Sequence, residues 1–206
     1  VDNASTDGSA DYVRETCPGA RIIANEANLG FARAFNIGVQ SAKGTYVCVC
    51  NQDLRFRPGC MRALLDRLGE EPSIGLIGPR YHSFDGRLLK SARAFPRYRD
   101  IFYYALLLDR LFPTHREFAA WQMGWFDQRS ERYVDQPMGA VMMLPREVFD
   151  RIGLMDDSFP LFGNDVDLCR RLQAAGLKRL YFPRAMVEHY VGGSTSRRPC
   201  RSVVRS

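Results

Sequence analysis

The sequence predicts a single α/β domain built on a mostly parallel sheet with helices on its faces. Strand-like apolar runs alternate with helical patterns through the first half of the chain. The chain has 206 residues, of which 46% are hydrophobic, so it is long enough to bury one core and has the usual size of one domain. Acidic residues follow two predicted strands, and open parallel sheets bind ligands beyond the carboxyl ends of their strands.

The first half of the chain supplies most of the predicted sheet. Apolar residues recur at helical spacing from Ala34 to Ser41 and again from Met61 to Leu68, and Gly44 ends the first of these patterns. The expected elements are a strand end at 1–3, a helix over 10–16, a strand over 20–24, a helix over 31–42, a strand over 45–50, a helix opened by Pro58, and a strand over 74–77.

The middle of the chain is rich in aromatic and basic residues and weak in strand signals, which predicts an inserted helical segment over 95–133. Strand and helix signals then resume. The expected elements are a strand over 134–144, helices over 146–152 and 165–175, and strands over 180–182 and 187–189. We therefore divide the domain into a first half (1–94), the insertion (95–133), a second half (134–194) and a flexible basic tail (195–206).

The charge balance favours an anionic partner. The chain has 29 Lys and Arg against 23 Asp and Glu, a net charge of +6. The surplus at Arg97, at Arg99 and in the tail suits a phosphate-bearing partner or an anionic membrane surface, and it serves solubility equally well. No aromatic residues alternate with these arginines and no helix-turn-helix or zinc-finger pattern occurs, so we do not expect nucleic-acid binding.

Cysteine spacing and hydropathy indicate where the protein resides. The six cysteines include no C-x-x-C pair and no paired metal spacing, which fits reduced thiols in a cytoplasmic protein. The longest apolar run extends only from Ile101 to Leu108, whereas a spanning helix needs about 20 residues. We expect no transmembrane segment or signal peptide, and peripheral contact with the inner face of the membrane stays open.

The run from Gly163 to Arg171 predicts the edge of an active site. It places Asn164, Asp165 and Asp167 on the first turn of a helix, where unpaired N–H groups and the helix dipole stabilise carboxylates. Apolar residues just upstream would exclude water from one side. A carboxylate in such a place can act as a general base.

Six segments, in this order, resemble the inverting family 2 glycosyltransferases of the GT-A fold, in particular bacterial rhamnosyltransferase-like members. They are VDNASTDGS at 1–9, NLGFARAFNIG at 28–38, NQD at 51–53, GA at 139–140, NDVDLCRR at 164–171 and EHYVGGS at 188–194. The resemblance covers nearly the whole chain. It implies transfer of a sugar, rhamnose by analogy, from a UDP- or dTDP-sugar to an acceptor hydroxyl during cell-surface polysaccharide synthesis. It also implies that the family's first strand and helix are missing here.

The resemblance implies a divalent cation, Mg²⁺ or Mn²⁺, at Asp53. This residue closes the family's D-x-D motif, whose first Asp is replaced by Asn51, a residue that can still hydrogen-bond a ribose or sugar hydroxyl. His189 matches the family's C-terminal metal-ligand histidine. A cation held there would offset the charge that develops on a departing diphosphate. The alternatives are that Asp53 caps the turn before Pro58 and that His189 is structural.

The nucleotide is expected at the start of the chain. Asp2 matches the family's aspartate that contacts the pyrimidine base, and its alternative role is an Asx-turn that holds the loop. Gly30 would let the backbone approach the diphosphate closely, or it could simply end a turn and cap a helix. The predicted nucleotide-binding residues are Asp2, Asn3, Ser5, Asn28, Gly30 and Arg33.

Asp165 is the predicted general base, because it matches the second residue of the family's E-D pair, whose Glu is replaced by Asn164. Asp167 is the rival, and we expect it to be a helix-start or structural acid with Arg170 and Arg171 within pairing reach. The other alternative is that both aspartates only stabilise the helix start. Gly139 and Ala140 are expected to form a close-packed wall near the donor sugar, or else a strand bulge.

The acceptor is expected to be a glycan or a polyprenyl-diphosphate-linked sugar. The segment from Phe102 to Phe112, with its neighbouring arginines, would dock on the membrane and position this acceptor. The aromatic residues Trp121, Trp125 and Phe126 are expected to pack a small core in preference to stacking on sugars.

Two other functions compete with this interpretation. One is a non-catalytic, carbohydrate- or nucleotide-binding relative of the same fold, in which Asn51 and Asn164 have eroded the acidic sites. The other is a metal-dependent nucleotidyltransferase, which would need a glycine-rich phosphate loop that the sequence lacks.

Overall fold

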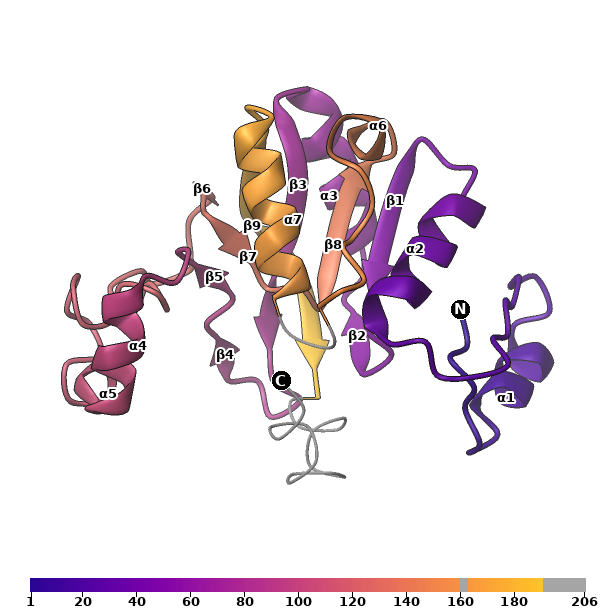
Figure 1. Cartoon of the computed structure of the whole chain (residues 1–206), viewed down its shortest axis with the longest axis horizontal. Coiled ribbons are helices and arrows are strands. Elements are labelled where there is room, and N and C mark those ends of the chain that lie inside the picture. Colours follow the sequence, from indigo (N-terminus) through magenta and orange to yellow (C-terminus); the bar gives the residue numbers. More distant parts are fainter. Residues whose placement is uncertain (160–162, 191–206) are drawn as a thin grey trace.

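The computed structural model describes residues 1–159 and 163–190 of the chain. Within these residues, a seven-stranded sheet has the main order β1-β8-β3-β9-β2, with β4 on β3 and β6 on β9 (Figure 1). Two further strands form a small sheet beside it. The strands are β1 (Tyr46–Cys50), β2 (Leu54–Phe56), β3 (Ile74–His82), β4 (Leu88–Leu89), β5 (Ala92–Arg93), β6 (Arg132–Tyr133), β7 (Gln136–Pro137), β8 (Val141–Pro145) and β9 (Lys178–His189).

Helices cover both faces of the sheet. The helices of the described residues are α1 (Ser9–Thr16), α2 (Phe31–Ser41), α3 (Cys60–Glu70), α4 (Tyr98–Ala105), α5 (Leu108–Leu111), α6 (Val148–Ile152) and α7 (Asn164–Ala174). One buried cluster joins α2, α6 and α7 to Leu76 and Met142. A second joins α3 to Ile77 and Met143, the adjacent residues in β3 and β8. Neighbouring residues on a strand face opposite sides, so these apolar runs reflect a sheet that is covered twice.

The prediction of a mostly parallel sheet is wrong. Among the paired named strands of the described residues only β3 and β9 run parallel, while β1–β8, β3–β8, β2–β9, β3–β4 and β6–β9 are antiparallel. Two neighbouring strands can run parallel only if the connection between them crosses back to the end of the sheet where the first strand begins. The connection from β3 to β8 does not cross back. β8 therefore starts at the end of the sheet where β3 finishes and runs antiparallel to it.

Most predicted elements are confirmed with small shifts of their ends, and the others differ. The strand predicted over 134–144 is two strands of different sheets, β7 and β8, and the strand end predicted at 1–3 has only a single bridge at Asp2. Residues 20–24 form no strand, because the segment has only an isolated bridge between Asp2 and Ala24 in place of a neighbouring strand. The two strands predicted near the end of the second half are one continuous strand, β9. The predicted tail, 195–206, lies outside the described residues.

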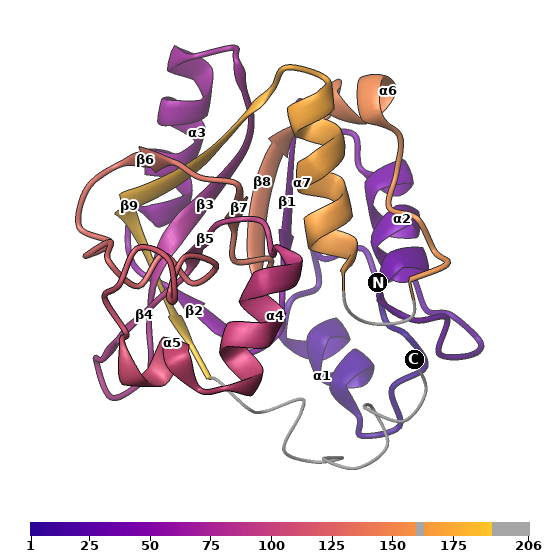
Figure 2. The ribbon, with the colours of Figure 1, turned by 60° about the vertical axis from the view of Figure 1, so that its left-hand side comes forward.

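The expected insertion contains α4 and α5 followed by turns, and it forms a lobe at one side of the sheet (Figure 2). In both views this lobe lies toward the same end of the sheet as the final residues of β9 and the start of α7. We call this end, where β1, β3 and β9 finish, the carboxyl end. No helix in residues 1–159 and 163–190 is long and apolar enough to cross a bilayer.

Candidate active site

Asp53 and His189 meet at the carboxyl end of the sheet. The chain turns sharply after β1 and enters β2, which pairs antiparallel with the last residues of β9 and sets Leu54 opposite His189. The backbone N–H of Tyr190 donates to the Asp53 carbonyl oxygen at 3.0 Å. As a result His189 Nε2 lies 3.4 Å from Asp53 Oδ1, with both side chains less than one-fifth exposed, at 14% and 17%.

The Asp53–His189 pair fits a divalent cation. Asp53 Oδ1 and His189 Nδ1 are both buried and have no hydrogen-bond partner, although buried polar atoms are nearly always satisfied. A carboxylate oxygen and an imidazole nitrogen are donors suited to Mn²⁺ and acceptable to Mg²⁺. The described residues contain no cluster of three His, Cys, Asp or Glu side chains around one point.

Asp165 lies in the first turn of α7, where it contacts two other elements. Gln136 Nε2, on β7, donates to Asp165 Oδ2 at 2.6 Å, and the N–H of Val166 donates to Oδ1 at 3.0 Å. A Cβ added to Gly139 would stand 3.2 Å from Asp165 Oδ2, so a larger residue there would press on the carboxylate. The carboxylate is oriented on one side by the helix start and on the other by the β7–β8 segment.

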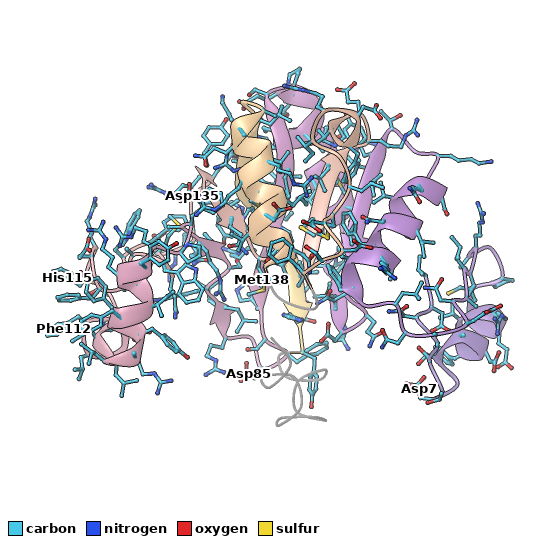
Figure 3. All side chains as sticks on the ribbon, viewed as in Figure 1. Asp7, Asp85, Phe112, His115, Asp135 and Met138 are labelled. Atoms are coloured by element: carbon cyan, nitrogen blue, oxygen red, sulfur yellow. The ribbon has the colours of Figure 1, made fainter. Side chains whose placement is uncertain are left out.

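Residues 138–141 connect Asp165 to the Asp53–His189 pair. Gly139 lies against Asp165, and the carbonyl oxygen of Ala140 accepts the N–H of Asn51 at 2.9 Å. The next residue, Val141, donates its N–H to Tyr81 Oη at 2.7 Å, and the Tyr81 ring lies 6.1 Å from the His189 ring. Met138, at the start of this segment, is labelled beside the N-terminal end of α7 (Figure 3).

The two polar neighbours of Asp165, Asn164 and Asp167, have different surroundings. Asn164 is buried, at 3% exposure, and its Oδ1 has no partner, while its Nδ2 donates to the Phe159 carbonyl at 3.5 Å. Asp167 is bound by Arg171, with 2.7 Å between Oδ2 and Nη2. This contact is the one expected of a structural acid.

The predicted nucleotide-binding residues form a hydrogen-bonded loop. Asn3 Oδ1 accepts the Leu29 N–H and Asn25 Nδ2, and Asn3 Nδ2 donates to Asn28 Oδ1 at 2.9 Å and to the Gly30 carbonyl at 3.2 Å. The side chains of Asn3 and Asn28 thus hold this loop together. Gly30 has φ 83°, a conformation that favours glycine, and it caps α2.

Asp2, Ser5 and Arg33 have weaker or more exposed contacts. The Ser5 N–H is 3.4 Å from both carboxylate oxygens of Asp2, and Arg33 Nε pairs with Asp157 at 2.7 Å on the surface. In the described residues no hydrogen bond or ion pair joins Asp2 to Asp53 or Asp165. From the sequence we expect these three acids, which are far apart in the chain, to line a single cleft, and this stays a prediction.

Three further side chains near the candidate base were not identified in the sequence. Gln136 holds Asp165, Tyr81 joins the 138–141 segment to His189, and Arg93 is paired with Gln136 in the β5–β7 register. No motif marks them, because each acts through a neighbour that is distant in the chain. Phe126 lies in a small buried cluster with Tyr181, and Trp125 packs against it, as expected.

Comparisons with known proteins assign the chain to a family. The model of glycosyl transferase family 2 matches residues 1–130. The N-acetylglucosaminyl-diphospho-decaprenol L-rhamnosyltransferase of Mycobacterium tuberculosis is 31% identical over 213 residues, which cover 97% of this chain and 68% of that protein.

Two solved glycosyltransferases share the fold. The structure of GalNAc-T7 with UDP, GalNAc and Mn²⁺ gives a TM-score of 0.63 at 16% identity, over 90% of this chain and 34% of that one. The mannosyltransferase PcManGT of Pyrobaculum calidifontis, solved with GDP-Man and Mn²⁺, gives a TM-score of 0.59 at 20% identity. The match covers 93% of this chain and 47% of that one. The chain thus spans about a third to a half of these larger chains and shares their GT-A fold. From the family match, the identity and the fold together, we conclude that this chain is a glycosyltransferase and belongs to glycosyl transferase family 2.

Proposed function

We propose that this glycosyltransferase moves a rhamnose-type sugar, with inversion, from a dTDP- or UDP-sugar to a hydroxyl of a polyprenyl-diphosphate-linked glycan in cell-surface polysaccharide synthesis. The mycobacterial relative is named for rhamnosyl transfer to such an acceptor. The observation that carries the proposal is the 138–141 segment, which contacts Asp165 and, through Asn51 and Tyr81, adjoins the Asp53–His189 pair. This arrangement supports a general base and a diphosphate site in one region of the protein.

Asp165 acts as the general base in this proposal. In a direct displacement the acceptor hydroxyl loses its proton as its oxygen attacks the anomeric carbon, on the face opposite the departing diphosphate. The Asp165 carboxylate receives that proton. Gln136 Nε2 and the Val166 N–H each donate to one of its oxygens, which restricts the carboxylate's rotation and leaves further lone pairs for the acceptor.

Asp53 and His189 hold the donor side. They would bind Mg²⁺ or Mn²⁺, which when bound neutralises charge on the leaving diphosphate. Asn51, Gly139, Ala140 and Asn164 would contact the donor sugar, and Asp2 would accept the ring N–H of the pyrimidine base. The other nucleotide contacts in this proposal come from the N-terminal loop and the start of α2: Asn3, Ser5, Asn28, Gly30 and Arg33.

The α4–α5 lobe would contact the membrane that carries the acceptor. Its outer surface exposes large apolar side chains, with Tyr98 exposed by 93% and Leu111 by 68%, and Ile101 and Phe102 are more than half exposed. Arg110 has no ion pair among the described residues and can meet an anionic headgroup. Because the lobe lies toward the carboxyl end of the sheet, a bilayer beneath it would present acceptors to Asp165 (Figure 2). The protein would then work at the cytoplasmic face of the membrane.

A ligand screen followed by a transfer assay tests the proposed reaction. We expect dTDP- or UDP-sugars to raise the thermal midpoint only with Mn²⁺ or Mg²⁺, and GDP-sugars to have no such effect. With a short-chain acceptor, inversion is shown if the anomeric carbon of the transferred sugar has the opposite configuration in the product and in the donor. Binding without turnover would favour the non-catalytic alternative, and metal-independent stabilisation would contradict the role of Asp53.

Vesicle flotation tests the membrane contact. The variant Phe102→Ser/Leu111→Ser should lose most binding to vesicles containing anionic lipid, while Tyr12→Ser, a 67% exposed aromatic on α1, should retain it. If the bound fraction did not depend on the anionic lipid content, the proposed membrane contact of the α4–α5 lobe would be contradicted.

A further inference from the structure

Arg93 lies one strand away from the candidate base. In the small sheet Arg93 on β5 is the register partner of Gln136 on β7, and Gln136 Nε2 donates to Asp165 Oδ2 at 2.6 Å. The Arg93 guanidinium carbon is 5.9 Å from the centroid of the Trp121 ring, at the outer limit of a cation–π contact. The small β5–β7 sheet therefore places the cationic Arg93 beside the residue that holds Asp165.

The Arg93 guanidinium is half-buried, and within the described part of the chain it has no hydrogen bond and no ion pair. Burial lowers its pKa, and the charge of Asp165 only partly opposes this effect. Other arginines with little exposure are paired: Arg67 with Glu71 and Glu131, Arg171 with Asp167, and Arg179 with Asp135. A desolvated cation without a partner is costly to stability, so such a group is retained where a ligand supplies the missing anion.

We propose that Arg93 binds the diphosphate of the lipid-linked acceptor. This inference rests on the proposed function, which places a diphosphate on the acceptor as well as on the donor. In an inverting displacement the donor diphosphate departs from the face opposite the base. An anion bound next to the base belongs to the acceptor, whose attacking hydroxyl and diphosphate are separated by about one sugar ring.

The chemistry of this group suits a diphosphate. A guanidinium presents a planar fork of N–H donors that can bind two phosphate oxygens at once, and the flat Trp121 ring limits the orientations of the fork. Two more arginines, Arg170 and Arg179, lie over the ring of Phe95, two residues along from Arg93, at 4.5 and 5.7 Å. The facing acids are Asp165 and Asp135, and Asp135 is engaged by Arg179 and by the Phe95 N–H.

Paired acceptor analogues test the inference without donor present. One analogue carries its sugar on a short prenyl diphosphate, and the other carries the same sugar on a neutral alkyl group. By calorimetry the wild type should bind the diphosphate analogue about 10- to 100-fold more tightly, the range of one or two charge-assisted hydrogen bonds. Arg93→Gln should abolish that preference, and Arg93→Lys should keep only part of it, because an ammonium is a point charge without the fork.

Arg132→Gln is the matched control, since Arg132 lies over Trp125 at 5.2 Å but on β6, which pairs with β9 and not with the small β5–β7 sheet. It should retain the full preference. Equal preference in wild type and Arg93→Gln would overturn the inference, as would weaker donor binding by Arg93→Gln with acceptor binding unchanged. If Arg93→Gln unfolds, Arg93→Lys decides the matter by the same comparison. Because no transfer is measured, failure of the proposed reaction leaves this result intact.

Discussion

The two ends of the main sheet differ in how completely their polar side chains are hydrogen-bonded. At the end where β3 and β9 begin, Glu71 accepts hydrogen bonds from Lys178 and Ser73 at 2.7 Å, from Tyr133 at 2.6 Å and from Arg67 at 2.9 Å. These donors, Lys178 foremost, hold the Glu71 pKa well below its usual range. At the carboxyl end, by contrast, the buried polar atoms without a hydrogen-bond partner include Asp53 Oδ1, His189 Nδ1 and Asn164 Oδ1.

The contrast separates stability from function within one sheet. The satisfied contacts around Glu71, which we call the Glu71 network, connect the end of α3 to β6 and β9. Unsatisfied buried groups cost free energy, and proteins retain them mainly where a ligand or cation completes them. Substitutions at the carboxyl end should therefore reduce activity, and substitutions in the Glu71 network should reduce stability.

Asp165→Asn should give the largest effect. Losing the general base should lower kcat by about 100- to 10,000-fold, while nucleotide binding and the thermal midpoint stay close to wild type. The control is Asp167→Asn on the same helix turn, which breaks the ion pair with Arg171 and should keep its turnover. Steady-state kinetics in which both variants lost the same activity would indicate that the two aspartates only stabilise the helix start.

Asp53→Asn should come next. Removing this charge should weaken Mn²⁺-dependent donor binding by about tenfold or more, because a metal–carboxylate interaction is replaced by a poorer ligand. The free energy of unfolding without metal should be unchanged or higher, since a buried charge is removed. Calorimetry and denaturant unfolding measure these quantities, and the exposed Asp66→Asn is the control. A clear loss of stability in the metal-free protein would break the comparison between the two ends.

Gly139→Ala should have an intermediate effect. The added Cβ would stand 3.2 Å from Asp165 Oδ2, so it should displace the carboxylate and lower kcat by about tenfold. Overpacking should also cost about 1 kcal/mol of stability. Gly19→Ala, where the added Cβ meets nothing within 4 Å, should match wild type in both measurements. An unchanged kcat in Gly139→Ala would show that the Asp165 position is not critical.

Glu71→Gln should change stability alone, by about 1 kcal/mol at neutral pH, as expected of a partly exposed ion-pair network. Its pKa is depressed in the folded state, so its contribution is present above the unfolded value, about 4.3, and is lost as pH falls below it. Urea unfolding of wild type and variant should thus differ at pH 7 and converge in acid. Reduced turnover in this variant at pH 7 would mean that the two ends are not independent.

Local patterns were sufficient to predict the elements that carry the site. The apolar spacing of α2, α3 and α7 and the apolar runs of β1 and β3 are short-range signals, and their positions are confirmed. The direction of β8 was not predicted, because antiparallel and parallel strands have the same residue preferences and differ only in how the chain returns. Residues 20–24 have strand-like composition but no neighbouring strand to complete their backbone hydrogen bonds.

The sequence by itself determined the family resemblance, the candidate base Asp165 and the candidate cation residues Asp53 and His189, because each lies in a motif whose chemistry depends on residue type and short spacing. Only the tertiary structure decided that Asp53 and His189 lie 3.4 Å apart with buried atoms that make no hydrogen bond, and that Gln136 holds Asp165. It also decided that Arg93 makes no hydrogen bond or ion pair with the residues that the structure describes. These are relations between strands that are distant in the chain. Sheet register and burial create them, and neither can be deduced from local spacing.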